Sequence, residues 1–256
     1  MPSEPFVNKN SIVREIWGTS DTILLVFAGA SAEFALNKAV DWLYFTGKLP
    51  SDPLGRLFST VNYAKAIVFS EKDAAIKAID HITAIHTAVE NKRGEAIPEW
   101  AYKDVLFMLI DYSIRSYEIL ERPLHIDEKQ DVLHVFGNVG QRMGLKNLPL
   151  TYADFETTRN DHLNQNLKNG HYTKDLYKQY RKHLGIFRYR LLLESQIFLL
   201  PNTVRELLKL RKQSLLAPFI PIYKICRSLK IDWVFKDIIL PSAYKQEIKR
   251  LNITSS

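Results

Sequence analysis

The sequence predicts an all-α protein, and three observations lead to that prediction. Only 10 of the 256 residues are glycine, so turns should be few and helices long. Hydrophobic residues make up 46% of the chain and charged residues 25%, which is typical of a globular protein with a packed core. No stretch alternates apolar and polar residues between hairpin turns, so we expect no strands.

The first two helices are expected over residues 11–17 and 21–45. Asp21 should be the N-cap of the second, because a carboxylate can accept hydrogen bonds from the backbone N–H groups of a first helical turn. Gly47 and Pro50 should end it, since glycine and proline are the residues that fit a helix interior least well.

The next three helices carry start or stop signals. Residues 56–69 and 71–93 follow each other closely, and Gly94 should end the second, because glycine readily adopts the left-handed conformation found after a helix. Residues 98–120 should form the third, with Pro98 in the first turn, where the missing N–H of proline does no harm.

The second half of the chain continues this pattern. Residues 127–143 are expected to form a helix capped by Asp127 and closed by Gly144. The remaining helices are expected over residues 151–168, 173–184, 187–200, 202–212, 218–229 and 241–251.

Basic residues are concentrated toward the C-terminus. Residues 204–250 hold eleven Lys and Arg against four acidic residues, a surplus equal to the net charge of +7 of the whole chain. The rest of the chain is therefore close to neutral, which argues against a nucleic-acid partner. We expect a helical domain over residues 1–212 and a basic C-terminal extension over residues 213–256 that packs on it.

Within that extension, residues 215–240 mix apolar and aromatic side chains with Lys and Arg. A basic amphipathic segment of this kind can lie on an anionic bilayer, which would make the protein a peripheral membrane protein. Alternatively, it packs its apolar side on the domain. The sequence leaves both interpretations open.

Three features bear on the compartment. The N-terminus shows no basic run followed by an apolar stretch, so we expect a cytoplasmic protein. Cys226 is the only cysteine, which excludes an internal disulfide and any Cys-x-x-Cys metal site. The most apolar run, residues 22–36, is shorter than the roughly 20 residues of a membrane span and contains Glu33, so no transmembrane helix is expected.

One face of the predicted 71–93 helix holds a histidine among aliphatic residues. Ala75, Ile79, Ile82, His86 and Val89 follow at intervals of four, three, four and three, which places them on one side of a helix. A buried imidazole needs a partner. That partner is either a backbone carbonyl, which would make His86 a core residue, or an iron atom held in an apolar helical pocket.

Other candidate residues are weaker. Arg56 and Thr60 lie four residues apart on the preceding helix and could share a polar edge of a pocket, or be a surface arginine and a hydroxyl bonded to its own helix. His81 lies about 140° round the helix from His86 and should be solvated. The other histidines among polar neighbours should also be at the surface, namely His125, His162, His171 and His183.

Common catalytic motifs are absent. The sequence holds no paired Glu-x-x-His motifs, no His-Glu-x-x-His zinc motif, no Walker loop, no Gly-x-Gly-x-x-Gly and no Gly-x-Ser-x-Gly. Di-iron, zinc hydrolase, nucleotide-binding and serine hydrolase functions therefore lack support.

A set of motifs resembles the mpaB-like and latex-clearing-protein (rubber oxygenase) haem oxygenases. That family's pattern has an arginine, a threonine four residues later and a histidine about 26 residues beyond, which matches positions 56, 60 and 86. The surrounding residues that resemble the family are Asp52-Pro53-Leu54-Gly55-Arg56-Leu57, Tyr63, Val68-Phe69, Ile85-His86-Thr87-Ala88-Val89, Pro123-Leu124, Gly144-Leu145 and Pro149.

The resemblance implies a single globin-like multi-helix bundle that binds haem b, with His86 as the axial iron ligand. It further implies that Arg56 and Thr60 lie near the haem as cofactor-binding and catalytic residues. The activity it implies is oxidation or cleavage of an unsaturated hydrophobic substrate, isoprenoid or lipid-like, with O₂.

Three places differ from many family members. Val89-Glu90-Asn91 stands where a Val-Arg-Gly-like ending often follows the axial histidine. Asn37-Lys38 stands where a His-Pro pair is frequent, and Ser59 stands where rubber-cleaving members have lysine. Two alternatives are therefore kept: a haem-binding sensor or carrier without turnover, and a haem-free helical protein that binds a lipid or a partner.

Overall fold

The structure is a computed structural model that describes residues 4–47 and 51–229. Within these ranges a few helical side chains lie outside the description, those of Pro53, Leu54, Arg56, Leu57, Phe58 and Ser228. The described residues form helices and no strand, which confirms the predicted all-α class. The expected helix over residues 241–251 lies outside the described residues.

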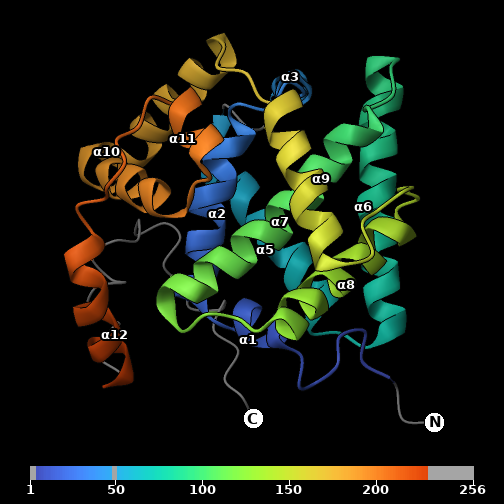
Figure 1. The fold of residues 1–256 in the computed structure, drawn as a ribbon. Helices are drawn as coiled ribbons and strands as arrows, with labels where there is room; N and C mark the ends of the chain where they lie inside the picture. Colours follow the sequence, from blue (N-terminus) through green and yellow to red (C-terminus); the bar gives the residue numbers. More distant parts are fainter. Residues whose placement is uncertain (1–3, 48–50, 230–256) are drawn as a thin grey trace.

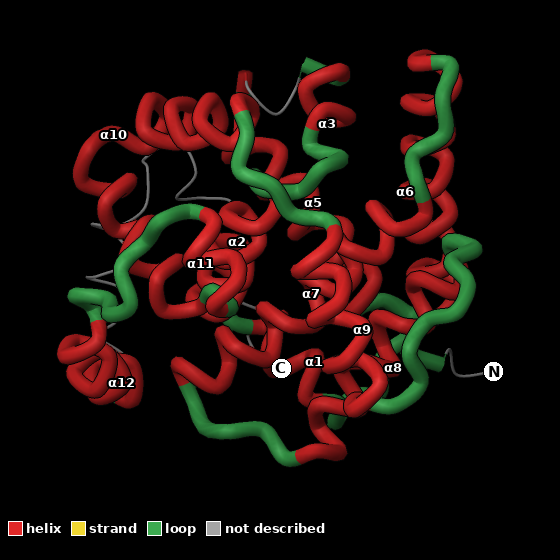
Figure 2. The backbone as a smooth tube through the Cα atoms, turned by 45° about the horizontal axis from the view of Figure 1, so that its top comes forward, coloured by secondary structure: helices red, strands yellow, loops and turns green. Residues whose placement is uncertain are grey.

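The helices surround a central pair formed by α2 and α7 (Figure 1). Helix α6 lies at one side of the molecule and α10 and α12 at the other, as both views show (Figures 1 and 2). The helices are α1 (Ile12–Gly18), α2 (Ser20–Phe34), α3 (Asp41–Phe45), α5 (Pro53–Val68), α6 (Lys72–Arg93), α7 (Glu99–Leu120), α8 (Ile126–Arg142), α9 (Tyr152–Gln165), α10 (His171–Leu199), α11 (Asn202–Leu207) and α12 (Ile220–Ser228), with a 3-10 turn η1 (Ala217–Phe219).

Polar caps fix where several helices begin. The Asp52 side chain accepts a hydrogen bond from the backbone N–H of Gly55 at 2.9 Å, which satisfies a donor of the first turn of α5. Two predicted caps are wrong, because α2 already begins at Ser20 and α8 at Ile126, each before its expected aspartate. Gly94 follows α6 with a φ of +75°, as predicted for a helix end.

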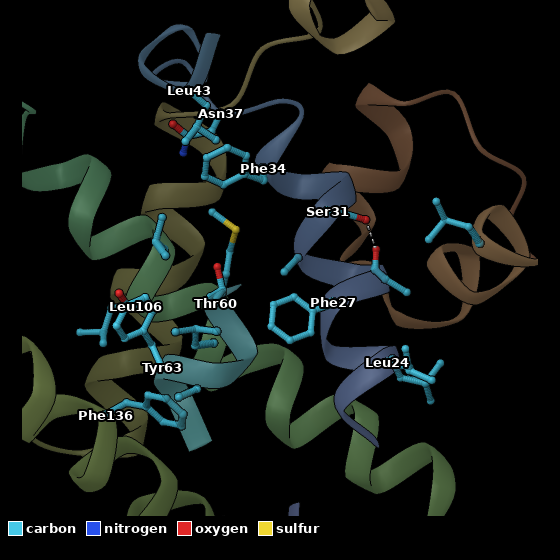
Figure 3. A pocket seen from close by; sticks show the side chains of 18 of the residues that line it. Leu24, Phe27, Ser31, Phe34, Asn37, Leu43, Thr60, Tyr63, Leu106 and Phe136 are labelled. Carbon is cyan, nitrogen blue, oxygen red and sulfur yellow. Dashed lines mark hydrogen bonds between the residues drawn. The ribbon is translucent and has the colours of Figure 1, made fainter. Parts of the chain in front are cut away.

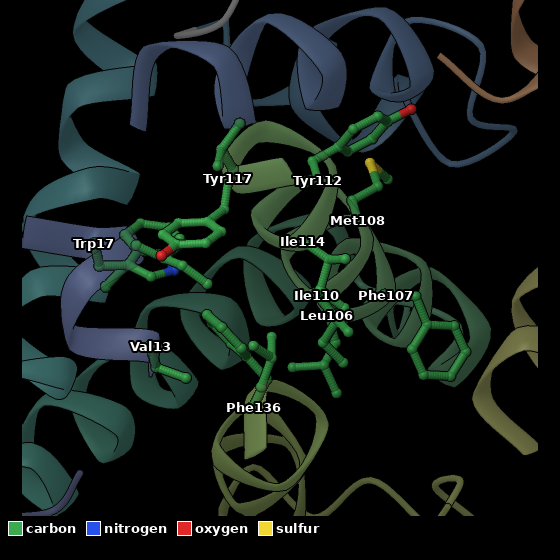
Figure 4. Close-up of a cluster of buried hydrophobic side chains, with 14 of the residues drawn as sticks. Val13, Trp17, Leu106, Phe107, Met108, Ile110, Tyr112, Ile114, Tyr117 and Phe136 are labelled. Atoms are coloured by element: carbon green, nitrogen blue, oxygen red, sulfur yellow. The ribbon is translucent and has the colours of Figure 1, made fainter. Parts of the chain in front are cut away.

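The core forms where α1 meets α7 and α8 (Figure 4). Trp17 is fully buried, with its ring centre 6.4 Å from that of Phe27 and 5.9 Å from that of Phe136. Its indole N–H donates to the Ser113 hydroxyl at 3.1 Å, so burying the indole leaves no donor without a partner.

A close approach joins α2 and α7. A Cβ atom on Gly29 of α2 would lie 2.3 Å from the ring of Tyr112, so only glycine leaves room for the ring. The Tyr112 hydroxyl donates to Glu33 of α2 at 2.8 Å. This contact starts a buried polar cluster.

That cluster pairs two carboxylates with two guanidinium groups between α2, α7 and α9. Arg159 donates to both carboxylate oxygens of Glu33, the first at 2.6 Å, and approaches Asp111 at 3.3 Å. Asp111 also accepts from Arg115 at 2.6 Å. Burial alone would lower the pKa of Arg159, but the charges of Glu33 and Asp111 outweigh burial and raise it.

The single helix expected over residues 21–45 is wrong. Helix α2 ends at Phe34, a turn follows, and α3 begins at Asp41. Asn37 explains the break, because its side-chain amide donates to buried Asp104 at 2.8 Å while its backbone pairs with Leu167. A continuous helix would carry Asn37 away from both partners.

His162 also differs from the sequence expectation. Its ring pairs with Asp104, and its side chain is only 16% exposed rather than solvated. Asn166 donates to the same carboxylate at 3.1 Å. His162 therefore helps to satisfy a buried acid that joins α7 to α9.

Helix α10 combines the two helices expected over residues 173–184 and 187–200. They are joined through a kink at Gly185, whose φ is +72°. A side chain would be strained at this φ, so glycine permits the bend. In the part of the chain described, no helix is both long enough and apolar enough to cross a membrane.

Candidate functional site

A large cavity of about 1370 Å³ lies among the helices, and its walls are mostly apolar. Figure 3 shows part of the wall, with Phe27 and Phe34 of α2 opposite Thr60 and Tyr63 of α5. Its volume exceeds the roughly 300–1,000 Å³ typical of ligand pockets. The cavity is therefore large for a ligand pocket, and its walls suit an apolar molecule.

The wall formed by α6 contains His86. Ala75 and Ile79 are buried in the packing of α6 against its neighbours, whereas Ile82, His86 and Val89 further along the same face line the cavity. The Nδ1 atom of His86 is shielded from solvent. The predicted inward orientation of His86 is thus confirmed, and its environment is a cavity rather than a closed core.

His81 occupies a different side of α6. It is exposed, as expected, and its ring centre lies 6.0 Å from that of Tyr63. His81 is not among the residues that line the cavity. The two histidines of α6 are therefore not equivalent.

Helix α5 lies against α6 and brings Thr60 to the same cavity as His86. The Thr60 side chain is half-buried and lies in the wall beside Tyr63 (Figure 3). Arg56 belongs to α5, but its side chain lies outside the described residues. Of the three residues predicted for the site, two therefore line the same cavity, and the prediction for Arg56 stays untested.

Tyr102 of α7 packs edge-on against the His86 ring, with ring centres 5.1 Å apart. The Tyr102 hydroxyl donates to Glu90 at 3.1 Å, and the same carboxylate oxygen accepts from the Ile97 backbone N–H at 2.8 Å. Burial, followed by the charge of Glu90, raises the pKa of Tyr102, so this hydroxyl stays protonated. Glu90 therefore holds Tyr102 against the imidazole.

Sequence reasoning missed this arrangement. Glu90 follows His86 by four residues and therefore shares its side of the helix, which is a signal the sequence contains. Nothing local indicates that Tyr102, on another helix, lies against the imidazole.

The end of α6 beyond His86 is fastened to α3. The Arg93 guanidinium lies 3.9 Å from the ring centre of Trp42 and 2.7 Å from an oxygen of Asp41. Trp42 and Phe45 of α3 also line the cavity. These contacts keep α3 over the part of the cavity near α6.

The opposite part of the cavity is formed by α10, η1 and α12. Residues of α2 and α7 also line the cavity, among them Leu24 and Val105. The contribution of the last helices was not expected. It includes Phe187 of α10, Phe219 of η1 and Ile222 of α12.

The arrangement of donors limits what the cavity can bind. In the described residues, no three His, Cys, Asp or Glu side chains are close enough together to hold a bare metal ion. A single imidazole such as His86 can hold iron when a macrocycle supplies the other ligands. Thr60, Tyr63 and Tyr102 add hydroxyl groups to a wall that otherwise suits an apolar molecule.

Comparison with known proteins identifies the family. The family described as "ER-bound oxygenase mpaB/B'/Rubber oxygenase, catalytic domain" matches residues 18–222, which include every residue that lines the cavity except Tyr223. No curated protein and no solved structure matches the chain.

Proposed function

The chain belongs to the mpaB and rubber oxygenase catalytic-domain family, and on that premise we propose that it is a haem b-dependent oxygenase with His86 as the axial ligand. Its substrate is an unsaturated hydrophobic molecule, isoprenoid or lipid-like, and its oxidant is O₂. The single observation that carries the proposal is the His86 imidazole in the wall of a large apolar cavity, next to the helix that holds Thr60.

The cavity residues fit a haem group. The flat faces of a porphyrin are apolar and match walls built from Phe, Leu, Ile and Val side chains. Its propionates need cationic partners, and Lys92 and Arg188 are cationic side chains among the lining residues. His86 is the imidazole donor that haem iron commonly takes.

When bound, haem supplies the iron chemistry that lets O₂ react with a carbon–carbon double bond. The residues of the chain do the rest. His86 would hold the iron, and Tyr102 limits the rotation of the His86 ring from the side. The Thr60 and Tyr63 hydroxyls can donate hydrogen bonds to oxygen atoms in the cavity, while the apolar wall binds hydrocarbon and excludes water.

The reaction balances without a further reductant. One O₂ that cleaves one C=C bond yields two carbonyl groups, so all atoms and electrons of the substrates appear in the products. The cavity volume of about 1370 Å³ leaves room for a hydrocarbon chain beside the cofactor.

The proposal is tested by adding haem to purified protein and recording the visible spectrum, then measuring O₂ uptake. We expect a Soret band, and uptake with an unsaturated isoprenoid or lipid but not with its saturated counterpart, with two carbonyl groups formed per O₂. Haem binding without uptake of O₂ would favour the sensor or carrier. A protein that takes up no haem would refute the proposal and favour the haem-free binding protein.

A further inference from the structure

Helix α12 turns its charged side chains toward the protein. The Arg227 guanidinium lies 3.1 Å from a carboxylate oxygen of Asp21, which is buried in α2. The Tyr223 hydroxyl donates to the same carboxylate at 3.1 Å. The Lys224 ammonium donates to the backbone carbonyl of Glu121 at 3.0 Å. Most surface helices have the reverse orientation, with charges in solvent and apolar residues inside.

The apolar residues of this segment point away from the protein. We call Leu215, Phe219, Ile222, Ile225 and Leu229 the apolar face of α12; their exposed fractions are 66%, 59%, 53%, 59% and 64%. From Phe219 to Leu229 the intervals of three and four residues place these side chains along one side of the helix, and Leu215 lies in the turn before it. Large apolar groups gathered on a surface are unfavourable in water, and such patches mark interaction sites.

The apolar face continues into the cavity. Phe219 and Ile222 are both exposed and part of the cavity lining, and so is Phe187, which is 61% exposed beside the Gly185 kink of α10. Ile186, its neighbour in the kink, is 60% exposed. Helices α10 and α12 lie on the same side of the molecule in both views (Figures 1 and 2). The cavity therefore reaches the surface among exposed apolar side chains.

The same part of the chain is strongly basic. Residues 176–229 hold eleven Lys and Arg against two Glu, a larger surplus than the net charge of +7 of the whole protein. Lys182 and Arg190 of α10 and Lys212 near η1 are exposed. Exposed basic residues in this region complement the negative charge of anionic lipid headgroups. Lys224 and Arg227, which bind groups of the protein, are not among them.

We propose that the apolar face of α12, together with Ile186 and Phe187, docks on an anionic lipid bilayer. Docking places the mouth of the cavity against the hydrocarbon of the membrane. A hydrophobic substrate can then pass from the bilayer into the cavity without crossing water; this last step rests on the proposed function, whereas docking itself does not.

Vesicle flotation of the full-length protein tests docking. We expect binding to vesicles of phosphatidylcholine and phosphatidylserine that is at least about tenfold stronger than to phosphatidylcholine alone and that weakens with added salt. Phe219→Ser/Ile222→Ser should weaken binding at least about tenfold, because two apolar anchors are lost. The matched control is Leu150→Ser, which changes a residue 74% exposed in the loop between α8 and α9 and should bind like the parent. Far-UV circular dichroism checks that each variant is folded.

Three outcomes would overturn docking. One is a lack of binding to either kind of vesicle, and another is equal binding by the double variant and the parent. The third is self-association of the parent that the double variant loses, because a second copy of the chain would then cover the face. The measurement needs no haem, so a colourless protein that still binds vesicles would refute only the proposed function.

Discussion

The buried pair of Glu33 and Arg159 should contribute strongly to the stability of the fold. Their side chains are 1% and 6% exposed, and with Asp111 and Arg115 they form a cluster with no net formal charge. Glu33→Gln leaves one positive charge in excess. Removing one partner of a buried pair costs about 3–5 kcal/mol. We expect a loss of about 3 kcal/mol, the lower end of that range, because the Asp111 carboxylate stays within 3.3 Å of Arg159 and offsets part of its charge. Asp111 also accepts from Arg115, so it does not replace Glu33 completely.

Urea unfolding followed by far-UV circular dichroism measures this loss. With a urea dependence of about 3 kcal/mol per molar, the midpoint should fall by about 1 M. The matched control is Asp80→Asn, because Asp80 also accepts two hydrogen bonds from one arginine, Arg142, but both side chains are about half exposed. The control should lose much less stability, because water screens an exposed pair. Equal losses in Glu33→Gln and Asp80→Asn would refute the reasoning that burial sets the strength of the pair.

Two further predictions concern packing and pH. Gly29→Ala should destabilise the protein by about 1–3 kcal/mol, because the added Cβ clashes with Tyr112. Gly137→Ala in α8, where a Cβ meets nothing within 4 Å, should instead stabilise it by up to about 1 kcal/mol. Thermal unfolding of both variants checks the contrast, and a stabilising Gly29→Ala would contradict it. The Arg122 guanidinium lowers the pKa of Glu128 to about 2, so its stabilisation is present above about pH 4.5 and is lost as the pH falls toward 2. The difference in melting temperature between Glu128→Gln and the parent should therefore become smaller as the pH falls from about 7 to about 3, and a constant difference would contradict this.

The sequence predicted the features that depend on local spacing. The helical class, the end of α6 at Gly94 and the side of α6 on which His86 lies follow from residue types and from intervals of three and four residues. Thr60 was placed near His86 only through a resemblance, and the structure brings both to one cavity.

What the sequence did not predict depends on contacts between distant residues. The break after α2 arises from the bonds of Asn37 to Asp104 and Leu167, which lie 67 or more positions away. Tyr102 meets His86 only because α7 packs near α6, and α12 completes the cavity wall through packing that no local pattern encodes. Hydrophobic periodicity shows which side of a helix is covered, but not by which helix.

The role of His86 as the axial ligand is the central claim, and His86→Gly tests it most directly. The visible spectrum of the haem-loaded variant should lose or strongly shift the Soret band, and free imidazole added to the buffer should restore it by taking the place of the missing side chain. His81→Gly is the matched control, since it puts the same helix-weakening glycine into α6 at an exposed position and should bind haem like the parent. A folded His86→Gly protein whose haem spectrum equals that of the parent without added imidazole would contradict the claim.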